Sequence, residues 1–207
     1  MPSRNVLKAD IADNFYHIYA RGNSRGKVFA DDEDYQFFLK LLRRYLSAEE
    51  AKDPYGISYP NFYNKLELTC FCLMPNHFHL LIYQHQQGAM AGLMRSLLTS
   101  YSRYFNKKYQ RSGPLFESRY KASRIDADNY LEHITRYIHL NPRQWRGHEY
   151  SSLKYYLLQN QESWIRPNRI LALFKSPHEY EQFVEDYSGH KQMLDILKHE
   201  LANDIDV

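Results

Sequence analysis

Residues 65–84 read KLELTCFCLMPNHFHLLIYQ, in which a Pro-Asn pair separates two apolar runs. Each run has the length and residue types of a strand, and Pro-Asn favours a turn. The stretch therefore predicts an antiparallel hairpin with strands at 65–74 and 77–84. Because side chains alternate along a strand, His77 and His79 should project from the same face of the sheet.

The regions around this hairpin predict further strands and helices. Aromatic and β-branched residues at 14–23 and 120–126 indicate strands. Apolar residues at helical spacing predict helices, which we place at 31–52, 88–110 and 126–140. The order is then strand, helix, strand, strand, helix, strand, helix, which is typical of an α+β fold. We therefore expect a ferredoxin-like antiparallel sheet that is covered by helices.

A soft boundary near residue 150 divides the chain into two parts. We expect residues 1–150 to form the main domain and residues 151–207 to form a helical C-terminal extension. Inside the extension the apolar pattern predicts helices only, around 151–159, 168–175, 177–187 and 190–203.

The composition is that of a globular protein. Hydrophobic residues make up 43% and charged residues 25% of the 207 positions, and no run of about 18 apolar residues could span a bilayer. The amino terminus lacks the apolar segment of a secretory signal, so we expect a cytoplasmic protein that makes no use of a membrane. Cys70 and Cys72 lie two positions apart in a predicted strand, which indicates buried, reduced thiols on one face.

Positive charge is concentrated in the middle of the chain, although the formal net charge is only +3. Between residues 95 and 124 the single acid is Glu117, and aromatic residues alternate with the bases. This composition favours a polyanion such as DNA, and a solvated helical face is the alternative. The candidate DNA-binding residues are Arg95, Arg103, Lys107, Lys108, Arg111, Arg119, Lys121 and Arg124.

The paired histidines form a candidate metal site, because two imidazoles that converge from one strand face can chelate a divalent ion. On its own the pattern is weak evidence, since surface and hydrogen-bonded histidines are commoner than ligands. His85 has the same parity as His77 and His79 but lies beyond the apolar run. A metal-dependent hydrolase that uses these three histidines is one reading, although it lacks the carboxylate of most hydrolytic zinc sites.

A second candidate group lies on the helix predicted at 126–140. Tyr137 and Asn141 are four positions apart, so a phenol and an amide oxygen would be presented one turn apart on one face. The alternative is that Tyr137 packs in the core and that Asn141 only marks the exit of the chain before Pro142.

Several segments, in their order along the chain, resemble the HUH single-tyrosine transposases, and most closely the REP-associated tyrosine transposases. The resemblance spans roughly residues 14 to 156, and it is specific because independent motifs agree in order and spacing. The segments are ARGNSRGKVFADDEDYQFFL (20–39), LMPNHFHLLI (73–82), SRYFNKKYQRSGPLFESRY (102–120), YLEHITRYIHLNP (130–142) and YSSLKYY (150–156).

The resemblance implies a site within an HUH domain over residues 1–150. His77 and His79 match the metal ligands of the family, and Tyr137 matches its nucleophile. Asn141 stands where relatives supply a third ligand. The implied activity is cleavage and strand transfer of single-stranded or hairpin DNA through a 5′-phosphotyrosine intermediate, with Mg²⁺ or Mn²⁺ bound.

The resemblance also implies the partners of the chain. Repeated extragenic palindromes that fold into hairpins would be the natural DNA target, and the protein would act as a monomer or a homodimer. A catalytically inactive DNA-binding regulator, derived from such a transposase, is the alternative to the enzyme.

Overall fold

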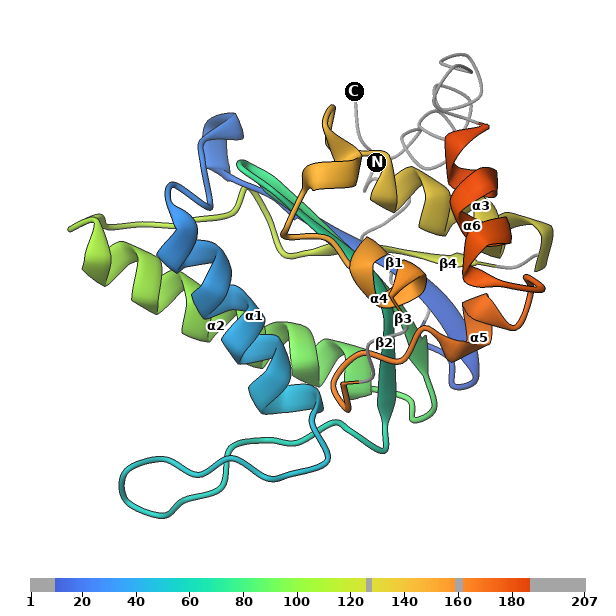
Figure 1. The fold of residues 1–207 in the computed structure, drawn as a ribbon. Coiled ribbons are helices and arrows are strands. Elements are labelled where there is room, and N and C mark those ends of the chain that lie inside the picture. The colour runs from blue at the N-terminus through green and yellow to red at the C-terminus, as the bar shows by residue number, and fades with distance from the viewer. Residues whose placement is uncertain (1–9, 126–127, 159–161, 187–207) are drawn as a thin grey trace, which may run out of the picture.

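The computed structural model describes residues 10–125, 128–158 and 162–186. None of the helices in these ranges combines the length and the apolarity that a membrane span requires. The centre is a four-stranded antiparallel sheet in the order β2-β3-β1-β4 (Figure 1). This order confirms the ferredoxin-like α+β fold. The strands are β1 (Asn14–Arg21), β2 (Leu66–Met74), β3 (His77–Gln84) and β4 (Lys121–Ile125).

The predicted hairpin is formed by β2 and β3, and it places the paired histidines inside the sheet. Strand β3 lies between β2 and β1, so that both of its edges are hydrogen-bonded. Across to β1, His77 pairs with Arg21 and His79 pairs with Tyr19. The register therefore surrounds the histidines with side chains of β1 that project from the same face.

Two long helices, α1 (Asp32–Leu46) and α2 (Ala89–Lys108), cover one face of the sheet (Figure 1). Alternate strand residues such as Ile18 and Phe78 point toward these helices and join one continuous apolar core. Helix α1 is shorter than the predicted range because Ser47 adopts an extended backbone, with ψ at 155°.

The opposite face is covered by the later part of the chain, which forms a second core with the sheet (Figure 1). Cys70 and Cys72 are buried in this core as free thiols, as predicted. The helix predicted at 190–203 lies outside the described residues. The helices on this face are α3 (Asp128–His139), α4 (Leu153–Leu157), α5 (Asn168–Leu171) and α6 (Pro177–Glu185).

Residues beyond 150 are joined to the rest of the fold by buried hydrogen bonds. The ring of His139, on α3, lies 2.7 Å from the Tyr180 hydroxyl through Nδ1 and 2.7 Å from the Ser152 hydroxyl through Nε2. The Tyr156 hydroxyl donates to the carbonyl of Thr69, on β2, at 2.8 Å. These contacts tie α6 to α3 and α4 to β2, and the domain boundary at residue 150 stays a prediction.

Candidate active site

The histidines of β3 and the end of α3 meet on the sheet face that carries the second core. His77 Nε2 lies 3.1 Å from Asn141 Oδ1, and Asn141 Nδ2 lies 3.5 Å from His79 Nε2. The ring of Tyr137 stands edge-on to His79, with 5.4 Å between the ring centroids. The structure therefore brings together the four residues that the sequence marks as ligands and nucleophile.

Helix α3 places its two residues because of its apolar stripe. Leu131, Ile134 and Ile138 are buried in the second core, and this packing fixes the rotation of the helix over the sheet. Tyr137 adjoins that stripe and is 5% exposed. Asn141 follows one turn later, where its backbone N–H still donates to the carbonyl of Ile138 at 3.4 Å. The spacing thus aims both side chains at β3.

A third histidine, His17 of β1, lies against His79. Its Nε2 is 2.9 Å from His79 Nδ1, and the two rings stack with an interplanar angle of 14°. His17 is fully buried, and its Nδ1 has no hydrogen-bond partner. If His79 donates its Nδ1–H to His17, the lone pair of His79 Nε2 faces Asn141. In that tautomer His79 can bind a metal ion through Nε2.

The surroundings of His77 fit a bound cation. Asn76 Oδ1 lies 2.7 Å from its Nδ1 and Asn141 Oδ1 lies 3.1 Å from its Nε2, so an oxygen faces each ring nitrogen. A neutral imidazole has one N–H and can donate to only one of these oxygens. The 3.1 Å separation also suits two adjacent ligands, because octahedral bonds of about 2.1 Å place neighbouring ligands about 3.0 Å apart.

The protonation states agree with ligand roles. Burial lowers the pKa of His77 to about 4 and lowers that of His79 well below its usual range, so both rings are neutral near pH 7. Among the described residues, no three His, Cys, Asp or Glu side chains cluster closely enough to hold a metal ion. A three-ligand set here therefore depends on the amide oxygen of Asn141.

His85 does not join this group. Its Nε2 lies 2.7 Å from Glu67 Oε1, and Arg169 of α5 binds the same carboxylate at 2.9 Å. Because His85 is hydrogen-bonded to Glu67 near the far end of β3, it does not supply the third ligand that the three-histidine hydrolase hypothesis requires.

Sequence reasoning missed the residues that β1 contributes. His17, Tyr19 and Arg21 alternate along this strand and share the face of the paired histidines. Their period of two is a signal that the sequence contains. It could not show that β1 pairs with β3, because that pairing joins residues about 60 positions apart.

The predicted DNA-binding residues fall into separate regions. Arg95, Arg103 and Lys107 are exposed on α2, which covers the face of the sheet opposite Tyr137. Lys121 begins β4 and lies across from Tyr19, beside the candidate site. The helix and the site therefore belong to different layers. The remaining exposed bases of the predicted set are Arg111, Arg119 and Arg124.

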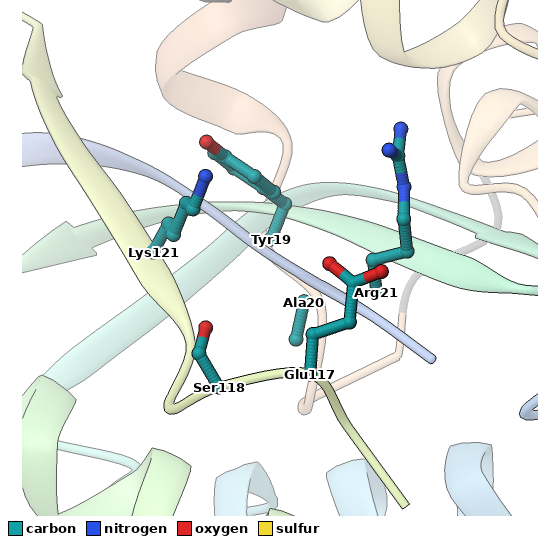
Figure 2. A pocket seen from close by; sticks show the side chains of 6 residues that line it. All are labelled: Tyr19, Ala20, Arg21, Glu117, Ser118 and Lys121. Carbon is teal, nitrogen blue, oxygen red and sulfur yellow. The ribbon is translucent and has the colours of Figure 1, made fainter. Parts of the chain in front are cut away.

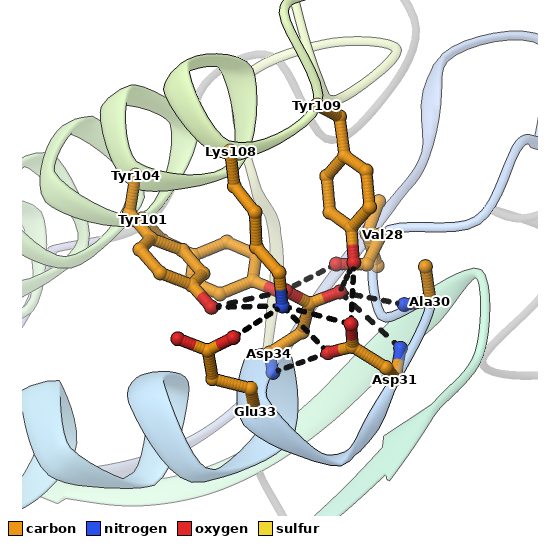
Figure 3. A network of polar contacts seen from close by, with 9 residues as sticks. All are labelled: Val28, Ala30, Asp31, Glu33, Asp34, Tyr101, Tyr104, Lys108 and Tyr109. Carbon is orange, nitrogen blue, oxygen red and sulfur yellow. Dashed lines mark hydrogen bonds and ion pairs between the residues drawn. The ribbon is translucent and has the colours of Figure 1, made fainter.

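Lys108 differs from the other predicted bases, because it is engaged with carboxylates of α1 and its cap (Figure 3). Its Nζ lies 2.7 Å from Asp31, 2.9 Å from Glu33 and 3.0 Å from Asp34. The Tyr109 hydroxyl donates to the fully buried Asp34 at 2.9 Å. Lys108 therefore compensates a buried charge and links α1 to α2, and its contact with DNA stays a prediction.

Comparison with known families gives the class of protein that this fold and site resemble. Residues 61–141 match the family described as "Transposase IS200 like", and this range contains both histidines, Tyr137 and Asn141. The chain thus resembles the single-tyrosine transposases over the region that carries its candidate site. No curated protein matches the chain.

Solved structures give the more particular similarity. The structure of a REP-associated tyrosine transposase bound to a REP hairpin matches with a TM-score of 0.52 and 13% identity, covering 74% of this chain and 84% of that one. A putative transposase from Deinococcus radiodurans R1 matches with a TM-score of 0.40 and 18% identity, covering 64% and 93%. The first match confirms the fold of a REP-associated tyrosine transposase.

Proposed function

We propose that the protein cuts and rejoins single-stranded DNA through a covalent bond to Tyr137. The observation that supports this most strongly is the convergence of a tyrosine, two neutral imidazoles and an amide oxygen. Tyr137 packs at 5.4 Å from the His79 ring, and Asn141 lies between His77 and His79.

In the proposed reaction the Tyr137 hydroxyl oxygen attacks the phosphorus of a phosphodiester. The P–O3′ bond breaks and the 5′ side remains bonded to the tyrosine. The Tyr137 hydroxyl loses one proton and the 3′ oxygen leaves as a hydroxyl with one proton, so the step is balanced. One phosphodiester replaces another, so a 3′-hydroxyl can attack the phosphotyrosine and rejoin a strand in the reverse step. Packing against His79 and His17 holds the Tyr137 ring in place for attack.

His77, His79 and Asn141 would hold a divalent ion, Mg²⁺ or Mn²⁺. When bound, such an ion supplies positive charge that polarises the phosphate and stabilises the leaving oxygen. The ligands are neutral, so they do not reduce that charge. His17 keeps the lone pair of His79 Nε2 directed at the site, and Asn76 accepts the Nδ1–H of His77.

The substrate we propose is DNA with an unpaired strand, such as a hairpin with single-stranded flanks. Tyr137 is only 5% exposed between the sheet and the helix that carries it, and an unpaired, flexible strand can bring a phosphate closer to such a hydroxyl than a rigid duplex can. The REP-associated relative was solved with a REP hairpin, and we extend that class of ligand to this chain. The exposed bases would contribute sequence-independent affinity for phosphates.

The test is formation of a covalent adduct. Labelled hairpin DNA and Mn²⁺ should give a protein–DNA species that survives denaturant, and Tyr137→Phe should abolish it while hairpin binding persists. Tyr55→Phe is the matched control, because Tyr55 is 88% exposed. An adduct that persists in Tyr137→Phe would assign the nucleophile elsewhere. Binding with no adduct in the unaltered protein would support the inactive DNA-binding regulator.

A further inference from the structure

Two buried polar atoms near the candidate site have no hydrogen-bond partner within the ranges that the structure describes. One is Nδ1 of His17, on β1, and the other is the hydroxyl oxygen of Ser123, on β4. His17 and Ser123 are cross-strand partners, so their side chains project from the same face of the sheet. Native proteins seldom leave such atoms unpaired, and here the two unpaired atoms belong to facing residues.

The neighbouring residues enclose His17 and its serine partner. On one side lies the cross-strand pair of Tyr19 and Lys121, and Figure 2 shows that both side chains project to the same side of the sheet. The Tyr19 ring stacks on His17, with 5.6 Å between the ring centroids. On the other side, the cross-strand pair of Phe15 and Ile125 packs against the second core. Bulk water therefore does not satisfy the two buried atoms.

The hydrogen bond between His17 and His79 decides what the second nitrogen of His17 must do. His17 is neutral because burial lowers its pKa to about 3, and a neutral imidazole carries one N–H. A metal ion on His79 Nε2 requires the His79 proton on Nδ1, which lies 2.9 Å from His17 Nε2 and donates to it. The proton of His17 is then on Nδ1, and this N–H needs an acceptor.

The amide of Asn141 favours the same arrangement. Its Nδ2 lies 3.5 Å from His79 Nε2, so an N–H of the amide faces the lone pair of that nitrogen. Its Oδ1 lies 3.1 Å from His77 Nε2 and is occupied there. The structure thus already directs the lone pair of His79 Nε2 into the site.

We infer that Ser123 is the acceptor for the Nδ1–H of His17, and that it thereby positions His79 for a metal ion. The inference rests on the proposed function, because the tautomer of His79 matters to that reaction only if His79 is a ligand. Cβ atoms of cross-strand partners lie about 4.5–5.5 Å apart, so a turn of the serine side chain or one bridging water joins the hydroxyl to the ring. A chain of hydrogen bonds then crosses three strands, from β4 through β1 to β3.

Metal binding fixes the protons of this chain, whereas the metal-free protein can redistribute them. With an ion on His79 Nε2, the N–H of His17 must stay on Nδ1, and Ser123→Ala leaves it without an acceptor. Without the ion, both protons can move to Nε2, and His17 then buries an unpaired lone pair instead of an unpaired donor. The Ser123 hydroxyl therefore stabilises the metal-bound protein more than the metal-free protein.

The experiment uses the full chain without DNA. NMR spectra of the imidazole nitrogens show which nitrogen of each ring carries the proton in the metal-free protein, and calorimetric titration measures the affinity for Mn²⁺. Ser123→Ala removes the hydroxyl, and Ser123→Thr keeps it. Ser151→Ala is the matched control, because it removes a buried hydroxyl beside β2, at the other edge of the sheet.

We expect the unaltered protein to carry the proton on Nδ1 of both His17 and His79. Ser123→Ala should move these protons toward Nε2 and should bind Mn²⁺ about twofold to tenfold more weakly, which is the range for one hydrogen bond. Ser123→Thr and Ser151→Ala should keep both the tautomers and the affinity.

Protons on Nε2 of both rings in the unaltered protein would overturn the inference, and this result needs no variant to fold. Equal Mn²⁺ affinities of the unaltered protein and Ser123→Ala would also overturn it, as would an equal loss in Ser123→Thr. In each of these cases a covalent adduct formed by the unaltered protein would still support the proposed function. The expected tautomers and affinities without any adduct would instead support the hydrogen-bond chain and contradict the proposed function.

Discussion

Replacing His17 separates a ligand-orienting role from simple packing. His17 is fully buried, contacts His79 Nδ1 at 2.9 Å and leaves its own Nδ1 without a partner. His17→Leu nearly preserves volume but removes the acceptor for the Nδ1–H of His79. In the variant without metal, His79 can move its proton to Nε2 and donate it to Asn141 once the amide turns its oxygen from His77 toward His79. Metal binding must then return that proton to a buried Nδ1 that has no acceptor.

The magnitude follows from the cost of that unsatisfied donor. A buried N–H without a partner costs about 1–3 kcal/mol, which corresponds to a loss of about 5-fold to 150-fold in metal affinity. The range includes the roughly 10-fold to 100-fold effects that follow loss of partners of metal-ligating histidines. Stability should change far less, because the metal-free variant avoids the cost by changing tautomer.

Calorimetric titration with Mn²⁺ measures this affinity, and urea unfolding without metal measures stability. We expect His17→Leu to bind Mn²⁺ at least about fivefold more weakly, with only a small change in the unfolding midpoint. His17→Gln keeps an oxygen acceptor of similar reach and should recover most of the affinity. Equal Mn²⁺ affinities for the unaltered protein and His17→Leu would refute the reasoning. Unfolding of both variants without metal would also refute it, because His17 would then be needed for stability.

Three further predictions concern single contacts. Lys108→Gln should lower the urea midpoint because it leaves the buried Asp34 carboxylate uncompensated, whereas the exposed neighbour Lys107→Gln should not. Asn141→Asp should bind Mn²⁺ more tightly yet slow adduct formation, since a carboxylate cancels part of the charge on the phosphate; unchanged affinity would remove Asn141 from the site. Burial raises the pKa of Glu67, but its hydrogen bonds to Arg169 and His85 lower that pKa overall. Glu67 therefore takes up a proton more readily in the unfolded chain than in the folded protein, and stability should fall as the pH drops below about 4.3. Glu67→Gln should flatten this acid-side decline in a pH series of unfolding midpoints.

The parts of the site that the sequence predicts are those set by local periodicity. The alternation of a strand places His77 and His79 on one face. The helical repeat orients Tyr137, and Asn141 follows in the turn just after the helix ends at His139. Local sequence patterns likewise predict the apolar stripe of α2 and the hairpin turn.

The parts that the sequence does not predict depend on pairing between distant segments. Lys108 belongs to a run of bases, and composition alone suggests a phosphate contact; its carboxylate partners lie 74 to 77 positions earlier. Likewise, the sequence does not connect His17 with the site until β1 is placed beside β3. The end of α1 at Leu46 depends on the backbone of Ser47, whereas the helical propensity of the following residues suggests a longer helix.

The residues of the candidate site belong to strand β3 and helix α3, which are held in the fold by different interactions. His77 and His79 lie on β3, whose amides are bonded on both edges and should exchange with solvent only when the whole domain opens. Tyr137 is carried by α3, which is held by side-chain packing and by the His139 hydrogen bonds. Partial separation of α3 from the sheet removes the nucleophile while the strand pairing survives. On heating, DNA cutting should therefore disappear at a lower temperature than the sheet signal in circular dichroism.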